Sequence, residues 1–239
     1  METSSQPFGT RAALVWILAS VIGWVFFPLN RFAVVRAYAD IPPLILAYAV
    51  SGAVVGLVLG TAQAWVVRRQ GYPARGWVPT TVAAYGLGLP LGLIVGLLIT
   101  VLSWRVVRGD DLLPLTAPAE YIGPTVWPYM GALVFGGGLV GLVQSRLVRH
   151  LLPSPNLRMA VLWAFGCWLE IGLGVWLGPI PAQVLLPPHV AINPTPLAFI
   201  LLAQVGTGLV SGTISGLILL ILLREARRIP GWAPVASGH

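Results

Sequence analysis

Charged side chains are scarce in this sequence of 239 residues: they make up 9% of the chain, and all fourteen basic residues are arginine. Soluble domains carry about 25% charged residues, whereas hydrophobic residues reach 57% here. A water-soluble globule is therefore disfavoured, and we interpret the chain as an integral membrane protein. The 28 glycines and 21 prolines fit this interpretation, because transmembrane helices tolerate both residue types better than soluble helices do.

Cysteine and histidine are rarer still. The single cysteine, Cys167, has no partner for an internal disulfide or a multi-cysteine metal site. Of the three histidines, His150 follows Arg149 at the inner interface, His189 lies in a proline-rich stretch and His239 is the last residue, which disfavours haem and chlorophyll ligation. Phosphate-binding and dinucleotide motifs are missing as well. We therefore expect no enzymatic activity, no cofactor and no bound metal.

Six apolar segments are long enough to cross a bilayer, whose hydrocarbon core of about 30 Å needs roughly 20 helical residues. The first is too long, and too far from the cleavage-like Ala37-Tyr38-Ala39, to be a signal peptide. The sequence thus predicts an all-α, polytopic membrane protein with a single transmembrane domain. Its predicted spans are 12–29, 44–67, 78–102, 126–148, 159–177 and 197–223.

The arginines are distributed unevenly between the two sides of these spans. Most lie in the N-terminus, the second and fourth connections and the C-terminal tail; Arg31, Arg36, Arg105 and Arg108 are on the other side. Arginines at span ends predict topology rather than a nucleic-acid partner, and the positive-inside rule places both termini in the cytoplasm of an inner cell membrane. We expect the proline-rich outer loop, 178–196, to be an extended cap, or alternatively a lid over an outward-facing site.

An internal repeat runs through the even spans. Gly56, Gly60, Gln63 and Arg68 recur at the same offsets as Gly137, Gly141, Gln144 and Arg149, and again as Gly212, Gly216, Leu219 and Arg224. The third and fifth spans share a pattern from Trp77 and Trp163 onward, whereas the first span matches poorly. Because each unit has an even number of spans, we predict three parallel helical hairpins, formed by spans 1–2, 3–4 and 5–6.

The repeat resembles one found in bacterial polytopic membrane proteins, in which a small-residue helix ends in glutamine and then arginine before a turn and a Trp-led helix. The segments 56–77 and 137–163 carry the resemblance. It implies the fold class and no particular activity.

Glycines spaced by four place small side chains on one helix face. Such rows let membrane helices approach closely, so we predict a helix-packing role; the alternative is a flat face for a planar ligand. The predicted packing residues are Gly52, Gly56, Gly60, Gly88, Gly92, Gly96, Gly137, Gly141, Gly174, Gly178, Gly208, Gly212 and Gly216.

Three glutamines are candidate site residues: Gln63, Gln144 and Gln204. Gln63 and Gln144 continue the glycine rows near the arginine ends of their spans. Their amides are expected to hydrogen-bond across helix interfaces, with ligand contact as the alternative.

Glu170 is the one acidic residue in the middle of a span. It follows Arg158 by twelve residues, about 18 Å along a helix, and insertion of an acidic residue at this depth costs about 2.5 to 3.5 kcal/mol. Its four-residue ridge holds Gly166, Gly174 and Gly178, which predicts that the carboxyl group faces another helix. It is either a cation or proton site or a structural hydrogen-bond donor.

Two functions follow from these features. The first is a non-enzymatic accessory subunit that packs against other membrane subunits or itself through small-residue surfaces. The second is a small permease that uses Glu170. Both place the protein in contact with the lipid bilayer and with no nucleic acid.

Overall fold

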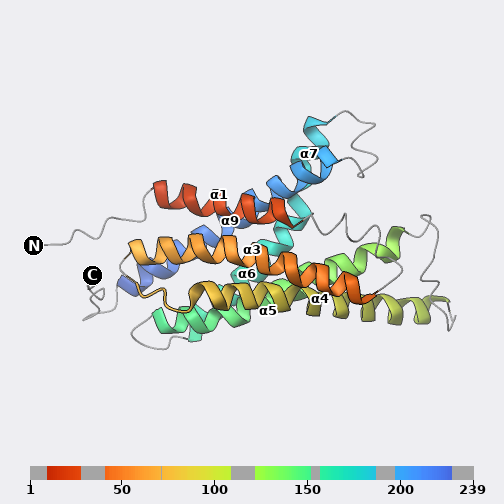
Figure 1. Ribbon diagram of the computed structural model, residues 1–239, viewed down its shortest axis with the longest axis horizontal. Helices are drawn as coiled ribbons and strands as arrows, with labels where there is room; N and C mark the ends of the chain where they lie inside the picture. Colours follow the sequence, from red (N-terminus) through yellow and green to blue (C-terminus); the bar gives the residue numbers. More distant parts are fainter. Residues whose placement is uncertain are drawn as a thin grey trace, which may run out of the picture.

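The computed structural model describes residues 10–27, 41–70, 72–108, 122–151, 157–186 and 197–227. Within these ranges every regular element is an α-helix and there is no strand, which confirms the all-helical class. Most of the helices run side by side along the long axis of the molecule (Figure 1). The described helices are α1 (Thr10–Phe26), α3 (Ile41–Arg69), α4 (Trp77–Arg108), α5 (Ile122–Leu151), α6 (Leu157–Leu177), α7 (Ile180–Leu185) and α9 (Leu197–Arg227).

Several of these helices are long and apolar enough to cross a membrane, so the chain is a membrane protein. In hydrocarbon, a helix satisfies every backbone N–H and C=O within its own segment, which is why such segments are helical. Large apolar side chains are exposed on the outside of the bundle, for example Leu14, Leu18 and Ile22 along one face of α1. Within the described residues the four candidate spans are Ile45–Arg69, Trp77–Ile99, Leu157–Leu185 and Leu197–Glu225, beside the shorter apolar helix Arg11–Phe26.

The helices extend beyond the apolar segments that predict them. The third apolar segment ends at residue 102, for example, whereas α4 continues to Arg108; the fourth begins at residue 126, whereas α5 begins at Ile122. Hydropathy marks only the part of a helix that fits the hydrocarbon core. The helical hydrogen-bond ladder itself can continue into the polar interface.

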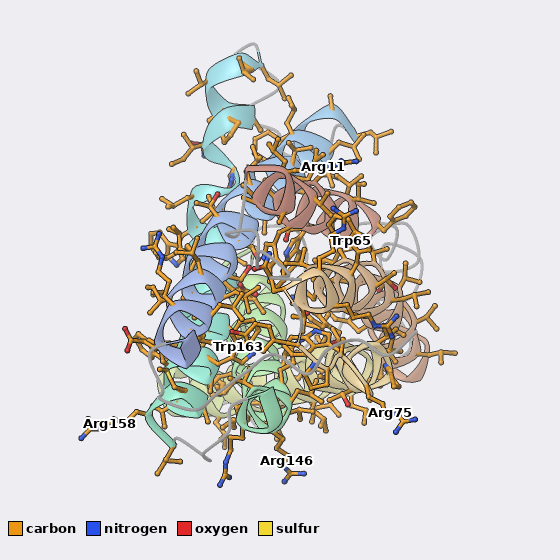
Figure 2. All side chains as sticks on the ribbon, turned by 90° about the vertical axis from the view of Figure 1, so that its left-hand side faces the viewer. Arg11, Trp65, Arg75, Arg146, Arg158 and Trp163 are labelled. Carbon is orange, nitrogen blue, oxygen red and sulfur yellow. The ribbon has the colours of Figure 1, made fainter. Side chains whose placement is uncertain are left out.

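The helices form a closed circuit. Each long helix contacts the next one along the chain, and α1 also packs against α9, which joins the first helix to the last. Figure 2, a view along the bundle, shows the helices arranged around a filled interior. The two ends of the chain's helical part are therefore neighbours.

One end of the bundle carries arginines. The start of α1, the end of α9, the α3–α4 turn and the end of α5 all lie at the left-hand end in Figure 1. Viewed from that end, Arg75, Arg146 and Arg158 point outward at the perimeter, whereas Trp163 lies among the helices (Figure 2). We call this the arginine end and the opposite end the far end. Exposed arginines in the described residues are Arg11, Arg68, Arg69, Arg75, Arg146, Arg149, Arg158 and Arg224.

The proline-rich loop starts differently from the extended cap predicted for it. Immediately after α6, the six-residue helix α7 begins, with Pro179 at its N-cap. Proline is well suited to the start of a helix, because the first N–H groups have no intrahelical partner and its φ angle is already helical. Residues 187–196 of this loop, and the acidic residues Asp110, Asp111 and Glu120 of the other one, lie outside the described residues.

The buried apolar side chains form two clusters, one on each side of a layer of polar residues. The arginine-end cluster includes Trp16, Val67, Tyr72, Trp77, Val148, Trp163, Cys167, Leu219 and Leu223. The far-end cluster includes Trp24, Phe27, Tyr48, Leu59, Tyr85, Leu89, Val140 and Ile171. On α6, Glu170 lies between Cys167 of the first cluster and Ile171 of the second.

Candidate functional site in the bundle interior

Two glutamines and two tryptophans form a hydrogen-bonded network near the arginine end. Trp77 Nε1 donates to Gln63 Oε1 over 2.9 Å, and Trp163 Nε1 donates to Gln144 Oε1 over 3.3 Å. The Gln144 amide Nε2 donates to Gln63 Oε1 over 3.3 Å and to Thr81 Oγ1 over 3.0 Å. The network therefore connects side chains from α3, α4, α5 and α6.

The side chains in this network are buried because their helices approach closely. Gln144 is 1% exposed, and Cys167 Sγ also donates to its Oε1 over 3.6 Å. The Trp77 and Trp163 rings meet edge to face with centroids 6.1 Å apart. This is one of the arrangements that aromatic pairs prefer. Both glutamines thus have protein partners across helix interfaces, and the ligand-contact alternative stays a prediction.

A second set of hydrogen bonds joins α1 to α9. Trp16 Nε1 donates to Ser215 Oγ over 2.9 Å, and Trp24 Nε1 donates to Ser211 Oγ over 3.3 Å. The Ser215 hydroxyl in turn donates to the Ser211 carbonyl oxygen over 2.8 Å. The Ser215 hydroxyl therefore bonds both to the backbone of its own helix and to α1, whereas the Ser211 hydroxyl accepts a bond from α1.

Glu170 lies in the interior between these two sets of hydrogen bonds. Its side chain is 4% exposed. Ser215 of α9 is within hydrogen-bonding reach of the carboxyl group, and Tyr85 of α4 and Cys167 of α6 are its electrostatic neighbours. The Oε2 atom is buried and has no hydrogen-bond partner. Such an atom is unusual, because buried polar groups are nearly always paired.

The candidate residues do not all meet at one place. Gln144 approaches Glu170 through Cys167, which contacts the Gln144 amide oxygen and precedes Glu170 by one turn. Gln204 is also buried, but it precedes Ser215 by eleven residues on α9, about 16 Å along the axis toward the far end. The structure therefore brings Gln63 and Gln144 together, places Glu170 beside them, and leaves Gln204 in a separate layer.

Sequence reasoning missed Trp16, Trp24 and Tyr85. Trp16 follows Arg11 by five residues, as Trp163 follows Arg158, and this spacing was a signal for the site. A second signal is the step of four from Trp16 to Ser20 and Trp24, which matches the step from Trp77 to Thr81 and Tyr85. The first span therefore resembles the third more closely than its overall composition indicates.

The glycine rows of the even spans lie against neighbouring helices. A Cβ atom placed on Gly56 would lie 2.7 Å from the Thr81 carbonyl oxygen on α4, and one on Gly141 would lie 2.6 Å from the Ala164 carbonyl oxygen on α6. On α9, a Cβ on Gly212 would lie 2.8 Å from Ser20 Cβ of α1. The other predicted glycines of the even spans also face a neighbouring helix. Gly52 and Gly60 lie against α4, Gly137 lies against α6, and Gly208 and Gly216 lie against α1.

The remaining predicted glycines lie on the odd spans. Gly88 meets Gly136 of α5, and Gly174 and Gly178 meet Thr207 of α9. Gly92 and Gly96 are buried. Twelve of the thirteen are therefore buried and Gly216 is half-buried, and the cost of enlarging them stays a prediction.

No group of three histidine, cysteine, aspartate or glutamate side chains converges on a metal position in the part of the chain that the structure describes. Comparison of the chain with protein-family models, with curated proteins and with solved structures finds no match. The geometry of the site itself is therefore the basis on which a function can be inferred.

Proposed function

We propose that the chain crosses an inner cell membrane six times, as three two-helix units, with both termini in the cytoplasm. Beyond the four candidate spans and the shorter apolar α1, the 30-residue α5 runs along the same bundle. The gathering of arginines at one end supports the orientation, because positive residues favour the cytoplasmic side.

Three equivalent contacts support the repeat, and each joins the even span of one predicted hairpin to the odd span of the next, with the last hairpin meeting the first. In each case the glycine face of an even span packs against an odd span: α3 against α4, α5 against α6, and α9 against α1. In each case an indole N–H on the odd span donates to a polar side chain on the even span; the pairs are Trp77 with Gln63, Trp163 with Gln144, and Trp16 with Ser215.

We further propose that the protein is a small permease for protons or small cations and that Glu170 is its binding group. The observation that supports this proposal is the Oε2 atom of Glu170, which is buried and has no hydrogen-bond partner. A structural carboxyl group would be expected to use both oxygen atoms, because an unsatisfied buried acceptor costs about 1–3 kcal/mol. An ionisable residue held at mid-membrane depth at such a cost is a functional-site candidate.

The accessory-subunit function stays a prediction. It depends on small-residue rows that would offer a surface to helices of other subunits. In this fold those rows pack against helices of the same chain. What remains outside is large apolar side chains, which suit lipid contact. The permease is therefore the function that the interior geometry favours.

Reconstituted liposomes test the proposal. We expect wild-type protein to move protons or small cations, measured with an entrapped pH dye and ion-selective dyes under an imposed potential. Glu170→Gln should abolish the flux while keeping the fold, because the amide is nearly the same size but cannot ionise. Glu225→Gln, in the last turn of α9, is the matched control and should retain it. Equal flux in both variants, or a stoichiometric partner subunit in mild detergent without any flux, would overturn the permease in favour of the accessory role.

A further inference from the structure

The Ser215 hydroxyl group donates its single proton to a backbone carbonyl oxygen. Its contact with the Ser211 backbone carbonyl, 2.8 Å long, must be donated by Ser215, because a carbonyl oxygen only accepts. Its contact with Trp16 Nε1, 2.9 Å long, must be accepted by Ser215, because an indole N–H only donates. What Ser215 offers to a third partner is its second lone pair.

The carboxyl group of Glu170 lies beside this hydroxyl group. A carboxylate has no proton to donate, so an ionised Glu170 would place an acceptor against an acceptor. A neutral carboxylic acid has one O–H donor and completes the hydroxyl's set of three hydrogen bonds. The remaining oxygen, Oε2, is then the uncharged carbonyl oxygen of the acid, whose lack of a partner costs much less than that of a charged oxygen.

Among the residues that the structure describes, the groups that face Glu170 supply no positive charge to hold a carboxylate. From α4 the titratable neighbour is Tyr85 and from α6 itself it is Cys167. The described interior parts of α5 and α9 contribute glycine, apolar and uncharged polar side chains. The arginines whose side chains the structure describes are all exposed.

We propose that the ligand of this site is a proton, carried on Glu170 as a neutral carboxylic acid that donates to Ser215, and that this proton exchanges with the solvent. The proposal depends on the permease function only for the transport of that proton. The two apolar clusters cover the site on both sides, so exchange requires the helices to move.

The α6–α9 interface gives this exchange a structural consequence. When the proton leaves, the O–H bond of Glu170 breaks, its electron pair stays on the carboxylate, and the proton passes to water. The Ser215 hydroxyl must then turn away from the Ser211 carbonyl to donate to the carboxylate, or α6 and α9 must separate. Protonation of one side chain thus changes the bonding between two helices.

Infrared spectroscopy of the full-length protein in lipid tests the protonation state directly, because a carboxylic acid has a C=O stretching band that a carboxylate lacks. We expect this band in the wild-type protein, its loss in Glu170→Gln and its retention in Glu225→Gln. Ser215→Ala should keep the band but shift its frequency, because it removes the acceptor of the acid's hydrogen bond. Transfer to D2O should also shift it, because the proton exchanges.

Three results would overturn the proposal: no such band in the wild-type protein, a Glu170-dependent carboxylate band in its place, or a band that D2O never shifts. The second would assign the site to a metal cation. A Glu170-dependent band that exchanges in D2O, combined with no ion flux in liposomes, would keep the proton site and refute the permease. The two proposals therefore fail separately.

Discussion

Replacing Gln144 with leucine is the sharpest test of the interior network, and the chain itself offers the precedent. Leu219 holds the corresponding place on α9 and is fully buried. Leucine therefore fits this position in one unit, so the substitution changes hydrogen bonding more than volume.

The expected loss of stability follows from the bonds that Gln144 makes. It takes part in three hydrogen bonds with nitrogen or oxygen partners on other helices and one weaker bond with Cys167. At an average near 0.6 kcal/mol for an interhelical hydrogen bond, their loss destabilises the fold by about 2 kcal/mol. Leaving the Trp163 indole N–H buried without a partner acts in the same direction.

Cys167 supplies the assay, since it is the only cysteine and is buried. A thiol-reactive dye added to the protein in detergent should react only as the bundle opens on heating. For a chain of this size, 2 kcal/mol corresponds to a Tm lower by about 4–8 °C.

Ser145→Ala is the matched control for this substitution. The Ser145 hydroxyl bonds only to the Leu142 carbonyl within its own helix, over 2.7 Å, so its removal should change stability by less than about 0.5 kcal/mol. A Gln144→Leu protein that melts at or above the wild-type temperature would refute the reasoning, because the network would then contribute nothing net.

Two further predictions concern glycine packing between helices and the orientation of the chain in the membrane. Gly56→Ala should lower the Tm, because its Cβ would lie 2.7 Å from a backbone oxygen of α4, whereas Gly172→Ala meets nothing within 4 Å and should leave the Tm unchanged or raise it; equal effects would refute close packing at Gly56. In a Cys167→Ser background, a membrane-impermeant maleimide should label His189→Cys on intact cells and Arg75→Cys only after permeabilisation, and the reverse pattern would invert the topology.

Hydropathy predicted the helical class and the membrane environment, because both depend on apolar residues counted along the chain. Helix ends were less predictable: Arg108 ends α4 beyond the apolar segment, since the hydrogen-bond ladder continues where the hydrocarbon stops. The short helix α7 was missed because Pro179 and Pro181 indicate a loop when counted as composition, yet they suit the first turn of a helix.

The candidate site was predictable only where one residue carried the evidence. Glu170 is conspicuous from its depth alone, since a lone acid there is costly. Ser215 and Tyr85 are neutral and lie on other helices, so nothing in their own segments links them to Glu170. Trp16 and Ser215 are 199 positions apart, and only the packing of α1 against α9 brings them together.

The closure of the bundle by its first and last helices has a consequence for the synthesis of the protein. Because the chain is made from its N-terminus, Trp16 and Trp24 enter the membrane long before the serines of α9 that accept their hydrogen bonds. Glu170 is likewise synthesised before Ser215, which lies beside its carboxyl group in the folded protein. We therefore expect the newly inserted helices to need temporary partners until α9 arrives, and a chain truncated before α9 to expose unpaired polar groups that membrane quality control can recognise.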